Sequence, residues 1–349
     1  MKFSRLARIL ILILECLYGG IRAHTGISAV RNKRQVRCAN RFAEITTGHT
    51  ACLQPSMKVE KSGVTEDEAK SIVHIHNTVR RDVSPQATDM QIMSWDAELA
   101  TFAQRWAENC VFQHDKNYKR RSFGRFSVGQ NLYMHSLRVS WSVAIKAWSD
   151  EKADYNYAGA STGVTGHYTQ MVWSSSSKVG CGYAYCSSVG NIYVCDYGPA
   201  GNMGNQLPYA RGTVCSACNG NCNNGLCDCR GRVCMNGGVL DLNTCTCSCN
   251  SQLDFYIQPD CALNCTDQQD PRYCTSQWGP GRCEEANIAE LCPGMCGWCP
   301  YAGANYVERP GGGGQTGGSS RLTATGTLYM LAGLGAVGVT LLWKGRLVI

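Results

Sequence analysis

The spacing of apolar residues predicts a first helix near the start of the folded part of the chain. In GVTEDEAKSIVHIHNTVRRDVSP, Ile72, Ile75 and Val79 lie three or four positions apart and therefore share one helical face. Thr65 precedes this run as a helix N-cap, acidic residues fill the first turn, and Pro85 closes the segment.

The same periodicity predicts two further helices, in SWDAELATFAQRWAENC (94–110) and around SWSVAIKAWSDEKADY (140–155). One face of the second helix carries four apolar residues: Leu99, Phe102, Ala103 and Trp106. On the first helix, we expect His76 to border the core, and Asn77 and Arg80 to serve as hydrogen-bonding scaffold. Four tryptophans are expected to anchor the core rather than to bind a ligand: Trp95, Trp106, Trp148 and Trp173.

Short stretches rich in β-branched and aromatic residues follow the helices. We predict strands in YTQMVW (168–173), KVGCGYAYC (178–186) and NIYVCDYGP (191–199). Helices come first and strands later, without alternation of the two. This order indicates the α+β class, with helices layered on an antiparallel sheet.

The uneven distribution of cysteines separates two kinds of region. Four of the 23 cysteines lie between residues 58 and 207, and sixteen lie between Cys215 and Cys299. The first region must fold around a hydrophobic core, whereas the second is too short and polar for one and must be held by disulfides. Cys16 belongs to the N-terminal leader, and the remaining 22 form an even number, as in a fully paired extracellular chain.

The N-terminal end predicts secretion. Basic residues, a short apolar run and small residues give residues 1–23 the pattern of a signal peptide that is cut after Ala23. Residues 24–64 then form an N-terminal extension. Within it, RNKR (31–34) has the spacing of a proprotein-convertase site, so a propeptide cut after Arg34 and a plain basic linker are both open.

The C-terminal end combines a glycine-rich linker (300–327) with a hydrophobic tail (328–349). Small residues at 317–319, a polar spacer and the apolar tail fit a GPI-anchor signal. Lys344 and Arg346 fit instead a short single span with a basic inner flank. Both alternatives predict an extracellular protein that the tail tethers to the cell membrane.

The net charge of +7 does not indicate a particular class of partner. The basic residues are spread out, and no basic stripe interleaves with aromatic residues. We therefore expect no nucleic-acid partner.

Six motifs occur in the order found in the CAP superfamily, which contains cysteine-rich secretory proteins, insect venom allergens and plant pathogenesis-related proteins. They are HNTVRRDVSP (76–85), QRWAENCVFQH (104–114), GQNLYM (129–134), AWSDEKADYNY (147–157), GHYTQMVW (166–173) and YVCDYGPAGNMGN (193–205). The chain resembles this superfamily over residues 68–210, and we assign residues 65–210 to such a domain. The resemblance implies a three-layer α-β-α sandwich.

The cysteine-rich end resembles three small modules: the hinge of cysteine-rich secretory proteins (212–228), an EGF-like module (229–261) and the sea-anemone toxin-like ShKT module (265–299). For the hinge, the resemblance implies the pairs Cys215–Cys222 and Cys218–Cys227. For the EGF-like module it implies Cys229–Cys245, Cys234–Cys247 and Cys249–Cys261. For the ShKT-like module it implies Cys265–Cys299, Cys274–Cys292 and Cys283–Cys296.

In the sandwich, the resemblance implies the pairs Cys110–Cys186 and Cys181–Cys195, and Cys38 and Cys52 remain to pair with each other. Family members often carry one more core disulfide. Its two positions correspond here to Val128 and Gly198, so both partners are absent together.

The resemblance also implies an open cleft in which two histidines and two acids meet. Motif by motif these are His114 in FQH, Gln130 in GQN, Glu151 in SDE and His167 in GHY. Gln130 stands where a glutamate is usual, which removes a charge and leaves an amide that can only orient its neighbours.

Three interpretations of this cleft stay open. His114, His167 and Glu151 could form an open zinc site, since neutral imidazoles with a carboxylate are good zinc ligands. Alternatively, Glu151 or His167 could act in hydrolysis by activating water or a serine. The run Ser174–Ser177 is the nearest in sequence, but we expect it to form a solvated turn, and neither a GxSxG nor an HExxH motif is present. Thirdly, the cluster could simply be a hydrogen-bonded polar floor.

The leading hypothesis is a non-enzymatic extracellular binding protein that requires no cofactor and has zinc as a candidate ligand. The family implies sterol or fatty-acid binding, adhesion, defence and venom roles, so the expected partners are an extracellular protein or a lipid. A metal-dependent endopeptidase is one alternative. Ion-channel modulation through the hinge and ShKT-like modules is another, although EEANIAEL (284–291) lacks the lysine–tyrosine pair with which channel-blocking toxins act.

One glycosylation sequon, Asn264-Cys265-Thr266, lies in the cysteine-rich end. Its middle residue is an expected disulfide cysteine, which disfavours glycosylation. The EGF-like segment lacks the acidic pattern of a calcium site, so we predict no calcium there.

Overall fold

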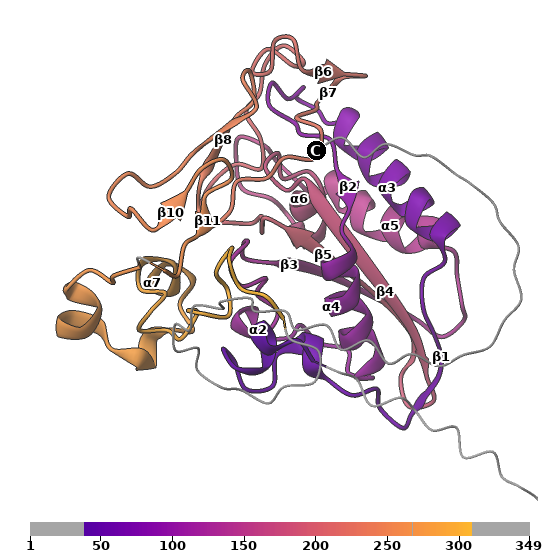
Figure 1. The fold of residues 1–349 in the computed structure, drawn as a ribbon. Helices are drawn as coiled ribbons and strands as arrows, with labels where there is room; N and C mark the ends of the chain where they lie inside the picture. The colour runs from indigo at the N-terminus through magenta and orange to yellow at the C-terminus, as the bar shows by residue number, and fades with distance from the viewer. Residues whose placement is uncertain (1–37, 267, 309–349) are drawn as a thin grey trace, which may run out of the picture. The chain divides into compact units, whose positions relative to one another are not determined.

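The computed structural model describes residues 38–266 and 268–308 (Figure 1). The expected signal peptide, the RNKR site and the hydrophobic tail lie outside these residues. Within the two described ranges, no helix has the length and apolar character that a membrane span needs.

A five-stranded sheet forms the centre of the sandwich, with the strand order β1-β4-β5-β3 and antiparallel pairing, while β2 pairs with β4 in parallel. Its strands are β1 (Val59–Ser62), β2 (Ser94–Trp95), β3 (Gly129–His135), β4 (Lys178–Cys186) and β5 (Gly190–Gly198). The strands predicted at 178–186 and 191–199 are thus confirmed. However, β1 precedes the first long helix and β2 follows it, so the order of helices before strands is only partly right.

Helices cover both faces of this sheet (Figure 1). On one face lie α3 (Glu66–Arg81), α5 (Trp141–Asp150) and α6 (Gly166–Met171), and on the other lies α4 (Ala97–Glu108). Short helical turns flank these elements: α2 (Asn40–Ala43), η1 (Thr50–Cys52), η2 (Asn117–Lys119) and η3 (Glu151–Ala153). The α+β class and the three-layer α-β-α sandwich are confirmed, as are the three predicted helices.

The ends of α3 follow the local sequence. The Thr65 hydroxyl accepts a hydrogen bond from the Glu68 amide (3.2 Å), and the Glu68 carboxylate accepts one from the Thr65 amide (2.8 Å), which completes a capping box. His76 is fully buried rather than at the border of the core, and its ring nitrogens contact the Ile72 carbonyl and the Tyr197 hydroxyl. This burial lowers the pKa of His76 to about 4.

Asn77 and Arg80 are scaffold residues, as expected. The Asn77 side chain exchanges two hydrogen bonds with the backbone of Met93. The fully buried guanidinium of Arg80 donates to four backbone carbonyls, those of Gln91, Met171, Trp173 and Ser174. Together they fix α3 to the segments beside it.

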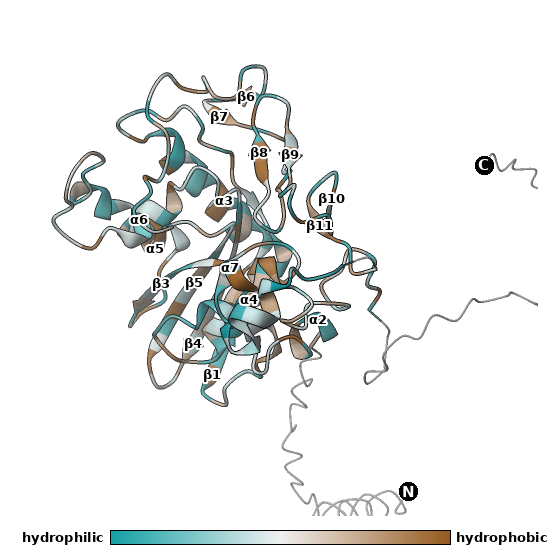
Figure 2. Cartoon of the chain, turned by 90° about the vertical axis from the view of Figure 1, so that its left-hand side faces the viewer, coloured by the Kyte–Doolittle hydropathy of each residue, from teal (hydrophilic) through white to brown (hydrophobic). Residues whose placement is uncertain are grey.

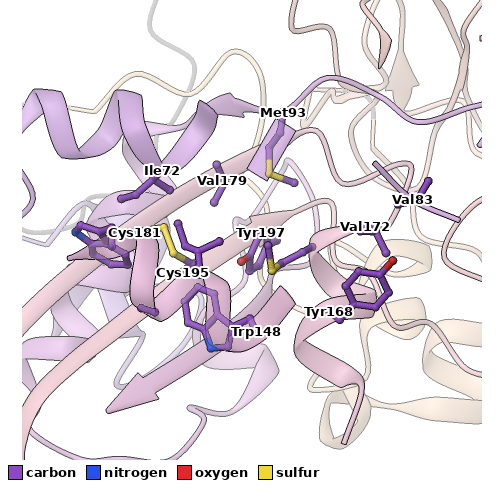
Figure 3. Close-up of a cluster of buried hydrophobic side chains, with 14 of the residues drawn as sticks. Ile72, Val83, Met93, Trp148, Tyr168, Val172, Val179, Cys181, Cys195 and Tyr197 are labelled. Carbon is purple, nitrogen blue, oxygen red and sulfur yellow. A yellow bond between two sulfur atoms is a disulfide. The ribbon is translucent and has the colours of Figure 1, made fainter. Parts of the chain in front are cut away.

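Two glycines of β4 allow α4 to approach the sheet closely. A Cβ atom at Gly180 would lie 2.0 Å from the Ala100 nitrogen, and one at Gly182 would lie 2.2 Å from the Gln104 nitrogen. Because side chains alternate along a strand, the intervening Cys181 points to the opposite face. There it pairs with Cys195 in the core under α3 and α5 (Figure 3).

The strand predicted at YTQMVW is wrong, because residues 166–171 form α6. The Glu151 carboxylate accepts hydrogen bonds from the His167 and Tyr168 amides in the first turn of this helix (2.9 and 3.0 Å). A side chain sixteen positions away therefore stabilises a helix against the local strand preference.

The tryptophans and the serine run also differ in part from expectation. Trp106, Trp148 and Trp173 are buried, but Trp95 is only half-buried. The solvated turn expected at residues 174–177 is wrong for its last two members, because Ser176 and Ser177 are buried.

The C-terminal cysteine-rich region, residues 212–266 and 268–308, contains only short elements. They are the hairpins β6 (Cys222–Asn223) with β7 (Leu226–Cys227), β8 (Val239–Asp241) with β9 (Thr246–Ser248) and β10 (Tyr256–Ile257) with β11 (Ala262–Leu263), then the turns η4 (Cys274–Trp278) and η5 (Pro280–Arg282) and the helix α7 (Ala286–Leu291). The described residues contain eleven disulfides. Ten have the pairing that the resemblances imply, and the eleventh joins the two remaining cysteines, Cys38 and Cys52, as expected.

The cysteine-rich region packs against the α4 side of the sandwich. Ala289 of α7 belongs to the same apolar cluster as Leu99 and Phe102 of α4, and Figure 2 shows the apolar α7 over α4. Arg121, which is 5% exposed, forms an ion pair with Glu290 and lies 4.9 Å from the centre of the Trp298 ring. These contacts join the two regions through buried side chains.

Candidate functional site

The four residues expected in the cleft form two hydrogen-bonded pairs. In the first pair, Nδ1 of His114 lies 3.0 Å from Oε1 of Gln130. His114 follows α4, where the Cys110–Cys186 disulfide and a hydrogen bond from the Trp106 indole to the Gln113 carbonyl hold the chain. A glutamine oxygen accepts only, so His114 donates from Nδ1 and keeps Nε2 unprotonated when the ring is neutral.

Gln130 is itself held by Asp196, which the sequence interpretation missed. The two residues are register partners on β3 and β5, and the Gln130 amide donates to Oδ1 of Asp196 (3.0 Å). Asp196 is fully buried, and within the described residues its Oδ2 has no hydrogen-bond partner. Burial, and next the neighbouring Asp115 carboxylate, raise the pKa of Asp196 well above its usual value. The available sequence signal was an acidic residue inside a strand that is otherwise apolar.

The second pair is His167 with Glu151. Nδ1 of His167 lies 2.5 Å from Oε1 of Glu151, whose other oxygen accepts the two α6 amides. The His167 ring also lies nearly parallel to the indole of Trp148, with 6.3 Å between the ring centres. Glu151 therefore orients His167, and both of its oxygens are already engaged.

This geometry differs from the three-ligand set expected from the sequence. Among the described residues, the one group of three metal-ligand side chains whose ligand atoms lie within 4.8 Å of one another is Cys215, Cys218 and Cys227. Their sulfurs are in disulfides. His114, Glu151 and His167 thus do not converge on one point, because Glu151 turns both oxygens toward His167 and the start of α6.

The two imidazoles remain as potential ligands. Within the described part of the chain, Nε2 of His114 and Nε2 of His167 have no hydrogen-bond partner. Desolvation, and then the charges of Arg120 and His167, lower the pKa of His114, whereas the Gln130 hydrogen bond opposes the shift. His114 is consequently neutral near pH 7, the form that binds a metal ion.

His114 and Gln130 border a cleft of about 450 Å³ at the end of the sheet. Gly129 is part of its floor, where a Cβ atom would lie 2.1 Å from Oε1 of Gln170. Glu284 lines the cleft from the cysteine-rich region. The cleft is thus bordered by both regions of the protein.

Neither Ser174 nor Ser176 is prepared as a nucleophile. The buried Ser176 hydroxyl donates to the Pro199 carbonyl (2.6 Å) and accepts from the Gln170 amide (3.1 Å). Ser174 donates to Asp89. These hydroxyls stabilise the loops beside α6.

Comparisons with known proteins agree with this architecture. The model of the cysteine-rich secretory protein family, CAP, matches residues 73–197. Cysteine-rich secretory protein 3 of Equus caballus is 50% identical over 173 residues, which cover 47% of this chain and 70% of that protein. The cysteine-rich venom protein of Conus textile is 33% identical over 290 residues, which cover 78% of this chain and 94% of that protein.

Among solved structures, that of NaASP2 with Zn2+ is 30% identical and covers 50% of this chain and 99% of that chain, with a TM-score of 0.41. The two sequence relatives exceed 30% identity over at least 70% of their own lengths. The chain therefore belongs to the cysteine-rich secretory protein family.

Proposed function

We propose that this protein is a non-enzymatic extracellular binding protein that binds a divalent metal ion through His114 and His167. One observation carries the proposal: each ring is held at Nδ1 by its own partner, while Nε2 has no partner within the described residues. Metal-binding histidines typically use their second nitrogen in this way, because the hydrogen bond fixes the tautomer and the ring orientation. Two imidazoles suit zinc and leave coordination positions for water or for a ligand.

The same contacts argue against catalysis. Both oxygens of the Glu151 carboxylate already accept hydrogen bonds, from the His167 ring and from two amides of α6, so neither is positioned to activate a water molecule. The Gln130 side chain is an amide and cannot act as a base near neutral pH. A bound metal would therefore serve to hold a ligand or to fix the cleft.

Zinc titration of the secreted, chelator-treated protein by calorimetry tests the metal site. We expect one site in the wild type, no binding in the His114→Ala/His167→Ala double variant, and about 10- to 100-fold weaker binding in Glu151→Gln, which keeps both imidazoles but replaces the carboxylate that orients His167 and the start of α6. His74→Ala is the matched control, because His74 is an exposed histidine on α3. Unchanged affinity in the double variant would refute the ligand assignment, and peptide cleavage lost in His167→Ala would refute the non-enzymatic part.

A second candidate function is lipid or sterol binding. A groove of about 590 Å³ runs between α3 and β2, and its apolar wall consists of Ala69, Val73, Ile92, Met93 and Trp95. The half-exposed Trp95 supports this function, since it presents an aromatic surface to the groove. We expect Val73→Asp to abolish binding of a fluorescent fatty acid to the groove. The control Val164→Asp changes an exposed valine outside the groove and should leave this binding unchanged.

We also propose that the hydrophobic tail, residues 328–349, tethers the protein to the cell surface. Residues 229–261 and 265–299 would form EGF-like and ShKT-like modules, which their disulfide pairing supports. Phosphatidylinositol-specific phospholipase releases the protein from cells if the tail is exchanged for a lipid. Retention on the membrane would support a single span instead.

A further inference from the structure

A second cavity, which we call the neutral pocket, has a volume of about 630 Å³ and lies between the loop after α5 and the loop after β5. Its walls combine aromatic rings with hydroxyl and amide groups: Tyr155, Tyr157, Thr169, Trp173, Asn205 and Gln206. None of the described residues that line it is an aspartate, glutamate, lysine, arginine or histidine. Its volume falls within the range of pockets that hold small ligands, ~300–1,000 Å³.

The walls of the neutral pocket are held in place by hydrogen bonds and a ring contact. The Tyr157 hydroxyl donates to the Tyr209 carbonyl (2.7 Å), and the two rings lie 5.1 Å apart. Asn202 ties the loop after β5 to α6, because its side chain accepts from the Thr169 hydroxyl (2.7 Å) and donates to the Gly166 carbonyl (2.8 Å). The pocket is therefore formed before any ligand arrives, which reduces the entropic cost of binding.

Two amides at the rim are available to a ligand. Asn205 and Gln206 are exposed, and their side chains make no hydrogen bond with other described residues. Each amide offers two donors and one acceptor, a combination that matches hydroxyl groups, which both donate and accept. Tyr155 supplies a half-buried ring whose packing against Tyr168 (5.6 Å between centres) fixes its orientation.

These features select a class of ligand. A phosphate, sulfate or carboxylate group would find no cation in the pocket, and a metal ion would find no charged ligand. A lipid chain would meet polar amides along one wall. We propose that the neutral pocket binds a neutral saccharide, whose apolar C–H faces lie against the tyrosine rings and whose hydroxyls bond to Asn205 and Gln206. This function is independent of the metal cleft, although Asn202 borders both cavities.

An array of immobilised oligosaccharides, probed with the secreted protein, tests the proposal. The array carries neutral glycans that end in mannose, galactose or N-acetylglucosamine, together with sialylated and sulfated versions of the same chains. We expect binding to at least one neutral glycan, with no gain from the acidic groups. Asn205→Ala and Gln206→Ala should each weaken binding about fivefold, the effect of losing one hydrogen bond.

Three controls locate the binding. Gln252→Ala removes an exposed glutamine side chain from the cysteine-rich region and should leave binding unchanged. Tyr155→Phe keeps the ring and should retain binding, whereas Tyr155→Ala should lose most of it. The His114→Ala/His167→Ala variant should bind glycans normally, which separates this inference from the proposed metal site.

Several results would overturn the inference. They are the absence of binding to any neutral glycan, binding only to sialylated or sulfated glycans, and binding that neither rim variant changes. A glycoprotein partner gives one more test. If the rim variants lose binding to it, but removing its glycans with an enzyme leaves wild-type binding unchanged, the pocket recognises polypeptide and the saccharide assignment is wrong.

Discussion

The sandwich and the cysteine-rich region differ in what holds them together. The sandwich buries large apolar clusters on both faces of its sheet and contains two disulfides, Cys110–Cys186 and Cys181–Cys195. The cysteine-rich region has eight disulfides and only short hairpins, turns and one six-residue helix, α7. The buried apolar residues of this region, among them Phe255, Leu263 and Trp298, belong to a cluster shared with α4 of the sandwich, so the region has no separate core and depends on its disulfides.

This difference explains where the candidate chemistry lies. The sandwich supplies the rigid surroundings that orient His114 and His167, namely the strand register between Gln130 and Asp196 and the packing of Trp148. The cysteine-rich region contributes Glu284 to the rim of the cleft that His114 borders. A region built on packing can therefore position side chains, and a region built on disulfides can modify the access to them.

The largest effect is expected from Gly182→Val. Valine favours strands, but its Cβ atom would lie 2.2 Å from the Gln104 nitrogen of α4, so the helix could not pack on the sheet. We expect a loss of more than about 4 kcal/mol and no secretion of folded protein. Gly281→Val in the cysteine-rich region is the matched control, since a Cβ atom there meets nothing within 4 Å. Normal secretion of Gly182→Val would contradict the close packing of α4 on β4.

The next largest effect is expected from removing one disulfide from each region and comparing the loss of stability. Cys274→Ala/Cys292→Ala should destabilise residues 265–299 by about 2–5 kcal/mol and make them sensitive to protease, while the sandwich stays folded. Cys181→Ala/Cys195→Ala should leave the sheet protected, because the two cysteines are register partners on strands that remain hydrogen-bonded. Limited proteolysis with mass spectrometry distinguishes the two patterns. If each double variant makes its own region equally sensitive to protease, the sandwich depends on its disulfide as much as the cysteine-rich region does.

The two regions also differ in how far their structure could be predicted. Thr65, the acidic first turn and the apolar spacing predicted α3 from local sequence alone. The disulfide pairing came from the resemblance of the cysteine pattern to known modules, since spacing alone does not determine connectivity. By contrast, α6 was predicted as a strand, because the carboxylate that stabilises its first turn belongs to Glu151.

The cleft could be predicted in composition but not in geometry. The motifs gave His114, Gln130, Glu151 and His167, and the structure brings them together in two pairs. They could not show that both oxygens of Glu151 are engaged, because that follows from the packing of α5 against α6. Asp196 was missed because its role depends on cross-strand register with Gln130.

A moderate effect is expected from pH, through the buried His76. Its folded pKa of about 4 lies below the ordinary value of 6.5, so between these values the unfolded chain binds a proton that the folded chain does not. The free energy of unfolding is therefore not reduced by His76 above pH 6.5. As the pH falls from 6.5 to 4, protonation of His76 in the unfolded chain lowers the free energy of unfolding by roughly 3 kcal/mol. Urea unfolding at pH 7 and pH 4.5 should show a smaller pH dependence in His76→Gln than in the wild type.

His49 provides the comparison for this measurement. It is buried in the N-terminal segment against Phe42, and burial lowers its pKa to about 4 as well. The double variant with His49→Gln should lose a second, similar part of the pH dependence. If the free energy of unfolding depends on pH as strongly in the single and the double variant as in the wild type, other groups cause the acid sensitivity.

The smallest effect isolates the local signals that specify helices of the sandwich. Thr65→Ala removes the side-chain half of the capping box on α3 and should cost about 1 kcal/mol. Ser140→Ala is its matched control, because Ser140 is the N-cap of α5 but its hydroxyl bonds to Ser142 and caps no backbone amide. Thermal unfolding should therefore show a lower midpoint only for Thr65→Ala. If both variants unfold alike, the capping box contributes nothing, and packing alone sets the start of α3.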